Sequence, residues 1–273
     1  MGIVAIDVGG TRTRVAWCEP SAGTHEDPSI EATPRAYADG INFLKLEIER
    51  VAAGRRIEAI VVGVPGIVDT ARGLLERSPH LPGWAGANLA DDLSVLCSKV
   101  IVRNDAALVG LGEAVYGAGK GFDIVAYLTV STGIGGARIV SGKLDPAFEG
   151  FEPGFQIIDV ERGATLEDLA SGSAVERRFG RHPKDVAKTL EWARVERALA
   201  VGIHNTVLHW SPNVVVVGGS MANDLSATRL SAELSRIMRV HARLPQVRLA
   251  TLGSIGGIFG AMALFACETS KTS

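Results

Sequence analysis

Two short stretches of the sequence place carboxylates where phosphate chemistry would need them. Residues 4–17 read VAIDVGGTRTRVAW, so Asp7 stands between an apolar run and a Gly-Gly-Thr turn. Residues 103–106 read RNDA and follow the apolar run VIV. Backbone N–H groups in a tight turn can bind a phosphate, and Mg²⁺ prefers carboxylate and phosphate oxygens, often through water. Asp7 therefore fits a magnesium-bound phosphate, and Asp105 fits a base that removes a proton from an attacking hydroxyl.

A second Gly/Thr turn strengthens this interpretation. Residues 127–144 read YLTVSTGIGGARIVSGKL and repeat the strand–turn–strand plan of residues 4–17. Alone, either hairpin is more often an ordinary β-turn, but two of them could hold a polyphosphate from both sides. Neither matches the G-x-x-x-x-G-K-[ST] phosphate loop. The stretch GAGKG at 117–121 has the wrong spacing for that loop and is interpreted as a helix end followed by a loop.

The other polar candidates have structural alternatives. Asp105 precedes the helix-forming run AALVGLGEAV, so it could equally be an N-cap, and a rigidly held cap would also be a well-placed base. Glu152 and Glu167 could accept hydrogen bonds from hydroxyl groups of a ligand, although each alone resembles an ordinary surface residue. The remaining histidines, including His204 and His209, have no metal-ligand spacing and are taken as incidental.

The elements around these residues indicate an α/β fold. Apolar runs such as IVV in 55–69 and VVVV in 213–221 are hydrophobic on both faces, which is typical of a buried, partly parallel sheet covered by helices. With one hairpin near the start of each half, two duplicated α/β lobes with a cleft between them are expected. The N-terminal lobe is predicted over 1–114, with a C-terminal helix at 255–269 packing back on it, and the C-terminal lobe over 115–254.

Composition limits the classes of protein to which the chain could belong. The chain has 273 residues, 47% of them hydrophobic, and a net charge of −2 without a basic cluster, so no nucleic-acid partner is expected. Cys18, Cys97 and Cys267 form no CxxC pair, which suits a reducing compartment. No signal peptide is recognised. The charge-free stretch 249–267 approaches membrane-spanning length, but a buried core helix is favoured, and a cytoplasmic protein without a membrane partner is expected.

Seven motifs in order resemble the ROK family of sugar kinases, within the actin-like ATPase and hexokinase-like superfamily. They span nearly the whole chain: DVGGTRTR (7–14), VPGIVD (64–69), SPHLPGW (78–84), RNDA (103–106), STGIGG (131–136), LEDLASG (166–172) and VVVVGGSM (214–221). The resemblance implies two RNase H-like lobes with mixed sheets flanked by helices, and a cleft between them. It also implies Mg²⁺ and ATP in that cleft, transfer of the γ-phosphate to a sugar hydroxyl, and a homodimer.

The resemblance also assigns roles to residues. Asp105 becomes the catalytic base. The sugar-binding residues it implies are Asn104, Glu152, Glu167, Gly66 and His80, the last standing where many members have an Asn. The nucleotide-binding residues it implies are Asp7, Gly9, Gly10, Thr11 and Thr13 in the first turn, Thr132, Gly133, Gly135 and Gly136 in the second, and Gly218, Gly219 and Ser220 after the VVVV run. Asp7 would also hold Mg²⁺, through water.

One departure from the family concerns zinc. Where the family has Glu-x-Gly-His, this chain has Glu152-Pro-Gly-Phe155, and DVERGATLE (159–167) replaces the family's cysteine cluster. A structural zinc needs thiolate and imidazole ligands, so no zinc site is expected. We expect Phe155 to supply apolar packing in its place and sugar binding to be weaker or less selective.

Several functions remain compatible with the sequence. The leading one is a glucokinase-like, ATP-dependent kinase of a hexose or N-acetylhexosamine, and a polyphosphate-dependent kinase is a variant of it. A sugar-sensing regulator would carry a helix-turn-helix before the first hairpin, for which the sequence leaves no room. A non-catalytic sugar-binding protein would need neither Asp7 nor Asp105. The sequence does not decide which sugar or which hydroxyl reacts.

Overall fold

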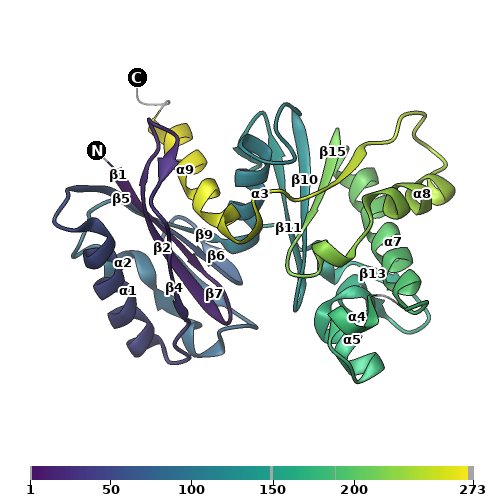
Figure 1. Cartoon of the computed structure of the whole chain (residues 1–273), viewed down its shortest axis with the longest axis horizontal. Helices are drawn as coiled ribbons and strands as arrows, with labels where there is room; N and C mark the ends of the chain where they lie inside the picture. The colour runs from purple at the N-terminus through teal and green to yellow at the C-terminus, as the bar shows by residue number, and fades with distance from the viewer. Residues whose placement is uncertain (1, 148–149, 188, 270–273) are drawn as a thin grey trace. The chain divides into compact units, whose positions relative to one another are not determined.

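The computed structural model describes residues 2–147, 150–187 and 189–269 (Figure 1). The chain divides into two compact units. Unit 1 comprises Met1–Gly112 and Ser254–Ser273, and unit 2 comprises Glu113–Gly253. Each unit has its own sheet and its own hydrophobic core.

Unit 1 is built on a mixed sheet with the strand order β3-β2-β1-β5-β9, and β4 pairs with β2. The strands are β1 (Gly2–Val8), β2 (Arg12–Glu19), β3 (Thr24–His25), β4 (Ser29–Ala32), β5 (Ile57–Val64) and β9 (Val100–Asn104), with β6 (Ile67–Asp69), β7 (Leu74–Arg77) and β8 (Ala87–Asn88) in a separate small sheet. The helices are α1 (Tyr37–Ala52), η1 (Pro82–Trp84), α2 (Leu89–Leu93), α3 (Asp105–Val115), η4 (Gly253–Ile255) and α9 (Gly256–Thr269). The last residues of α3 already belong to unit 2.

The two faces of strand β1 are covered by different helices. Val4, Ile6 and Val8 belong to a buried cluster with residues of α1 and α2, such as Leu44. Because successive side chains of a strand point to opposite faces, Asp7 lies on the other face. Helix α9 packs there, against β1, β2 and β5, so both faces of the sheet are buried. The strongly apolar composition of β1 and β5 follows from this burial.

Helix α9 approaches the sheet closely at a glycine. A side chain at Gly257 would place its Cβ 2.8 Å from the Cγ of Asp7, so only glycine fits without a rearrangement. Within the charge-free stretch, residues 256–267 thus lie in a helix buried on unit 1. No helix in the described part of the chain has both the length and the apolar character to span a membrane.

Unit 2 repeats the same strand plan in the order β12-β11-β10-β15-β16. The strands are β10 (Ile124–Val130), β11 (Ile134–Val140), β12 (Lys143–Leu144), β15 (Val214–Gly218) and β16 (Gln246–Leu249), with β13 (Ile157–Asp159) and β14 (Ala164–Thr165) forming a separate hairpin. The helices are η2 (Pro153–Phe155), α4 (Leu166–Ala170), α5 (Gly172–Phe179), α6 (Pro183–Val186), α7 (Trp192–Trp210), η3 (Ala222–Asp224) and α8 (Ala227–Ile237).

The duplication predicted from the two Gly/Thr turns is confirmed. In unit 1 the antiparallel hairpin β1–β2 continues into the parallel strands β5 and β9. In unit 2 the hairpin β10–β11 continues in the same way into β15 and β16. Helices α7 and α8 pack on each other, and their apolar residues join those of β10 and β15 in one core. The mixed α/β character expected for both lobes is therefore present.

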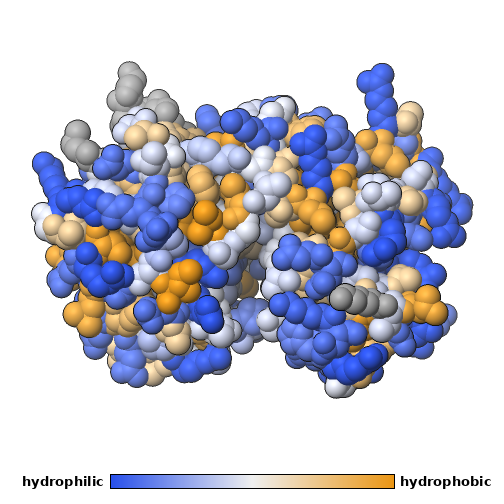
Figure 2. Space-filling view, viewed as in Figure 1, coloured by the Kyte–Doolittle hydropathy of each residue, from blue (hydrophilic) through white to orange (hydrophobic). Residues whose placement is uncertain are grey.

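The surface carries both polar and apolar residues. Figure 2 shows hydrophilic residues, in blue, over much of one face, with hydrophobic ones, in orange, in smaller groups between them. This agrees with a chain of which 21% is charged and 47% is hydrophobic.

Candidate active site

Two carboxylates of unit 1 lie close enough to influence each other, and a glycine makes room for them. Asp7 in β1 pairs with Gly63 in β5, and Gly63 pairs with Arg103 in β9. A Cβ on Gly63 would come within 3.5 Å of the Cα of Asp105, the first residue of α3. Burial is the largest influence on Asp7 and the charge of Asp105 adds to it, so the pKa of Asp7 rises to about 7 despite the opposing effect of Arg14.

The start of helix α3 is held by Asn104. Its Oδ1 accepts a hydrogen bond from the Ala107 N–H at 3.0 Å, which is the geometry of an N-cap. Asp105 is instead the first helical residue, and its Oδ1 accepts from the Ala106 N–H at 2.8 Å. The structural alternative of Asp105 as the N-cap is therefore wrong. Its carboxylate still benefits from the helix N-terminus, where the backbone dipole favours negative charge.

Asn104 also fixes the turn that contains Gly66. Its Nδ2 donates to the Gly66 carbonyl oxygen at 3.0 Å. Gly66 has a φ of 123°, and a Cβ there would lie 2.0 Å from the Arg77 oxygen, so no other residue fits this turn. Two residues predicted to bind sugar are thus joined by a hydrogen bond. Both the oxygen and the nitrogen of the Asn104 side-chain amide already form hydrogen bonds within the protein.

The first Gly/Thr turn is held by hydrogen bonds to residues of unit 1. The Gly9 N–H donates to the Arg12 oxygen at 2.9 Å, and the Thr33 hydroxyl donates to the Gly9 oxygen at 2.7 Å. Thr13 is only 1% exposed, and its hydroxyl lies 3.0 Å from that of Thr33. Two of the residues predicted to bind nucleotide therefore differ. Thr13 is buried and its hydroxyl bonds within unit 1, whereas Thr11 is exposed.

The loop that carries His80 lies against this turn. A Cβ on Gly10 would be 3.1 Å from the Cβ of His80. The Leu81 N–H donates to the buried Ser78 hydroxyl at 3.1 Å, which shapes the loop from within. The structure therefore brings a predicted phosphate turn and a predicted sugar contact together within unit 1.

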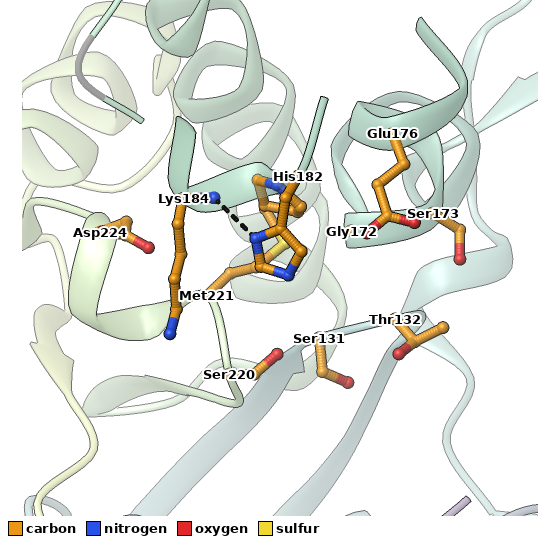
Figure 3. Close-up of a pocket in the computed structure, with 11 residues that line it drawn as sticks. Ser131, Thr132, Gly172, Ser173, Glu176, His182, Lys184, Ser220, Met221 and Asp224 are labelled. Carbon is orange, nitrogen blue, oxygen red and sulfur yellow. Dashed lines mark hydrogen bonds between the residues drawn. The ribbon is translucent and has the colours of Figure 1, made fainter. Parts of the chain in front are cut away.

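The second Gly/Thr turn borders a pocket of unit 2. The Gly172 N–H, at the start of α5, donates to the Ser131 oxygen at 2.7 Å, and the Ser173 N–H donates to the Thr132 oxygen at 3.2 Å. These bonds join the turn to the wall of a pocket of about 220 Å³ (Figure 3). The residues that line it are Ser131, Thr132, Gly172, Ser173, Glu176, His182, Pro183, Lys184, Ser220, Met221 and Asp224.

The pocket includes only some of the residues predicted to bind nucleotide. Thr132 and Ser220 line it. Gly133 and Gly136 are buried in the β10–β11 hairpin, Gly135 is half-buried in β11, and Gly218 is the buried last residue of β15. Gly219 directly precedes Ser220 and is exposed, with a φ of 90°. The loop after β15 therefore reaches the pocket through Ser220 and Met221.

Four titratable residues of the pocket were not recognised in the sequence: Glu176, His182, Lys184 and Asp224. They come from α5, from the start of α6 and from η3, and they meet only in the folded chain (Figure 3). The Lys184 N–H donates to His182 Nδ1 at 3.3 Å, drawn as a dashed line. No local motif distinguishes these residues from ordinary helix-surface residues. His182, one of the histidines interpreted as incidental, lines this pocket.

The two glutamates predicted to bind sugar are neighbours in unit 2. Glu167, in the first turn of α4, accepts from the Ile134 N–H at 2.7 Å. Partial burial, followed by the charge of Glu167, raises the pKa of Glu152. A bond from the strand backbone thus fixes one carboxylate, and a second carboxylate stands next to it. Such a pair offers several acceptors to hydroxyl groups.

The segment expected to replace a zinc site differs from the prediction. Phe155 is 57% exposed, so the expectation that it packs in an apolar interior is wrong. The preceding residues Pro153 and Gly154 are buried instead, which turns the ring outward at the end of η2. The described residues contain no group of three or more His, Cys, Asp or Glu side chains that could hold a metal ion.

The surroundings of Asp7 fit a bound cation. Its carboxyl is only 13% exposed, faces a second carboxylate, and has the Arg14 guanidinium at 3.6 Å. One cation at that distance does not balance two carboxylates. Mg²⁺ suits a carboxylate site of this kind, together with phosphate oxygens.

The fold is that of the actin-like ATPases, as predicted, and the comparisons with known proteins agree. The sequence model of the ROK family matches residues 3–268, so the chain belongs to the ROK family. The crystal structure of a ROK hexokinase from Thermus thermophilus has a TM-score of 0.86 to this chain at 27% identity, covering 99% of this chain and 100% of the hexokinase.

Two curated relatives are sugar kinases by name. A glucokinase from Thermotoga maritima is 27% identical over 261 residues, which cover 81% of this chain and 82% of the glucokinase. The N-acetylgalactosamine kinase AgaK from Shewanella sp. (strain ANA-3) is 25% identical over 298 residues, which cover 95% of both chains.

Proposed function

We propose that the protein is an ATP-dependent sugar kinase that phosphorylates a hydroxyl of a hexose or an N-acetylhexosamine. The observation that carries the proposal is the placement of Asp105 at the first residue of α3, beside the buried Asp7. Family membership and the two named sugar kinases among its relatives support the same reaction.

In this proposal each carboxylate of unit 1 has one task. Asp105 accepts the proton of the sugar hydroxyl as that oxygen attacks the γ-phosphorus. Asp7 holds Mg²⁺, which when bound neutralises charge on the donor phosphates. Asn104 fixes the start of α3 through the Ala107 N–H and so orients Asp105.

We assign the sugar contacts to side chains that can accept further hydrogen bonds. Glu152 and Glu167 accept hydrogen bonds from sugar hydroxyls, and the Ile134 N–H holds Glu167 in place. His80, beside Gly10, is proposed as a further polar contact. Sugar isomers differ in the direction of one hydroxyl, so these groups would set the choice of sugar.

The pocket of unit 2 favours a nucleotide over polyphosphate as the donor. It combines the Gly/Thr turn with apolar surface from Met221 and Pro183 and with several polar side chains. Polyphosphate has no base or ribose to occupy such a pocket, whereas ATP has both. We therefore propose that this pocket holds the nucleoside part of ATP.

The test is a screen with both donors. Purified protein is incubated with Mg²⁺ and either ATP or polyphosphate, across hexoses and N-acetylhexosamines, and the sugar phosphate is identified by mass spectrometry. We expect one class of sugars to be phosphorylated with ATP. Turnover with polyphosphate alone would change the donor. Absence of product with every sugar and both donors would refute the proposed function.

A further inference from the structure

We propose that Arg14 binds the phosphoryl group during its transfer and stabilises the charge on its oxygens. The proposal rests on the proposed function, because it assigns a further residue to that reaction. Arg14 lies on β2 directly opposite Asp7 on β1, so both side chains emerge on the same face of the sheet. Its Nη1 lies 3.6 Å from an oxygen of Asp7.

The guanidinium of Arg14 has unused hydrogen-bonding capacity. Its Nε is buried, and no acceptor among the described residues lies within hydrogen-bond distance of it. A buried donor without a partner costs free energy, so an arginine retained in this state suggests an acceptor that comes with the substrate. Guanidinium groups present several donors in a planar fork, which matches the oxygens of a phosphoryl group.

The position of Arg14 agrees with this role. It follows the Gly/Thr turn at residues 9–11 by three residues and faces Asp7, whose carboxyl is also influenced by the charge of Asp105. The other arginine in this row of the sheet, Arg103, is used elsewhere. Its Nη1 donates to the Val102 oxygen at 2.8 Å, and its Nη2 lies 3.8 Å from Glu268. Of these two arginines, Arg14 is therefore the one that faces Asp7.

The chemical step balances with Arg14 acting through hydrogen bonds alone. The sugar oxygen forms a bond to the γ-phosphorus, and its proton moves to the carboxylate of Asp105. The bond from that phosphorus to the oxygen bridging to the β-phosphate breaks, and its electron pair leaves with ADP. The guanidinium of Arg14 donates to non-bridging oxygens of the transferred group, where charge must be stabilised in the transition state.

The test compares Arg14→Ala and Arg14→Lys with the matched control Arg138→Ala. Arg138 is 23% exposed against 20% for Arg14, lies on a strand of unit 2, and likewise pairs with an aspartate, Asp145. We expect Arg14→Ala to lower kcat by ~10² or more, Arg14→Lys to lower it less, and Arg138→Ala to leave it near the parent value. Added guanidinium ion should restore part of the activity of Arg14→Ala.

The second measurement does not depend on turnover. Thermal unfolding is followed with ADP and Mg²⁺, and again with aluminium fluoride added as a mimic of the transferred phosphoryl group. The parent and Arg138→Ala should gain a further rise in Tm from the fluoride, and Arg14→Ala should lose that increment.

The outcomes separate the possible explanations. If Arg14 only balances the charge of Asp7, Arg14→Ala keeps the kcat of the parent and the same rise in Tm with aluminium fluoride. That result would overturn the inference. If the parent phosphorylates no sugar but shows the fluoride increment, the proposed function fails and the anion site can still be judged from the variants. Loss of the folded state in Arg14→Ala would leave Arg14→Lys to decide, since it keeps the charge without the fork.

Discussion

Asp105 combines a helix-terminal position with a neighbouring carboxylate, and its proposed role as the base is open to a direct test. Asp105→Asn keeps the side-chain shape but loses the basic oxygen, so we expect kcat to fall by ~10²–10⁴. The fold should be retained, because Asn104 and not Asp105 caps α3. Sugar phosphorylation and circular dichroism, measured on the same preparation, check both parts.

The control for this variant is Asp91→Asn. Asp91 lies in the first turn of α2 and accepts a bond from Asn88, so it has a similar helix position away from the proposed site. Near-native turnover by Asp105→Asn would mean that another group removes the proton.

The protonation of Asp7 predicts a stability that depends on pH. Its pKa is about 7 in the folded chain against 3.8 for an unperturbed aspartate, so the folded state binds this proton more tightly than the unfolded state does. The resulting stabilisation is present below about pH 4 and is lost as the pH rises to about 7.

Asp7→Asn removes this titration. Without Mg²⁺ and nucleotide, we expect the variant to unfold at nearly the same urea concentration as the parent at pH 4. At pH 8 the variant should be more stable than the parent by up to about 4 kcal/mol, since one unit of pKa shift corresponds to about 1.4 kcal/mol. Urea titrations at several pH values measure the difference, and a gap that did not widen with pH would argue against the raised pKa.

Residue-level prediction from sequence succeeds where a local rule exists. The hairpin register follows from the turn at residues 9–12, and it would already have placed Arg14 opposite Asp7. By contrast, Glu176, Lys184 and Asp224 reach one pocket only because α5, α6 and η3 pack together. No spacing in the chain encodes that meeting.

At the scale of elements, Asn104 links the start of α3 to the Gly66 turn. Asn104→Ala loses both the cap and the bond to the Gly66 oxygen, and we expect a loss of about 1–3 kcal/mol in the free energy of unfolding. Asn104→Asp keeps the cap acceptor and should cost less.

Asn88→Ala provides the comparison for Asn104. Asn88 caps α2 by accepting from the Asp91 N–H, and its amide donates to Asp91 of the same helix instead of a distant loop. Chemical denaturation should therefore rank Asn104→Ala as the more costly variant. Equal costs would mean that the Gly66 bond contributes nothing.

The β13–β14 hairpin carries the prediction about zinc. Residues 159–167, in place of the cysteine cluster, include the exposed Val160, and the exposed Phe155 and Ile157 come just before them. We expect protein purified without added zinc to contain none in stoichiometric amount, since thiolate and imidazole ligands are missing from the sequence here. Elemental analysis by mass spectrometry measures it, and one zinc per chain would contradict the expectation.

Elements were predictable where their pattern was long or repeated. The two hairpins, the buried parallel strands and the final helix all follow from apolar runs and glycine turns. The outward position of Phe155 did not follow, because an aromatic residue next to a short 3₁₀ turn gives no signal of which way the turn faces. The short β6–β7–β8 sheet also has too few residues per strand to show a clear period.

At the scale of the whole molecule, the sequence order of the two units differs. Unit 2 is one continuous stretch, whereas unit 1 needs both ends of the chain, because α9 covers the face of β1, β2 and β5. We expect a purified chain truncated after residue 253 to show a protease-resistant unit 2 and a protease-sensitive unit 1. Limited proteolysis of the truncated and the full-length chain measures this, and resistance of residues 1–112 in the truncated chain would contradict it.

The late arrival of α9 has a consequence for the life of the chain in the cell. Ile3 and Ala5 are fully buried in the finished protein, on the same face of β1 as Asp7. During translation, at ~5–20 residues per second, that face waits on the order of ten seconds or more for its helix. For this interval the nascent chain presents an apolar sheet surface of the kind that chaperones recognise and that aggregates readily. Unit 1, whose sheet is covered only after α9 has been made, is thus exposed to quality control for longer than unit 2.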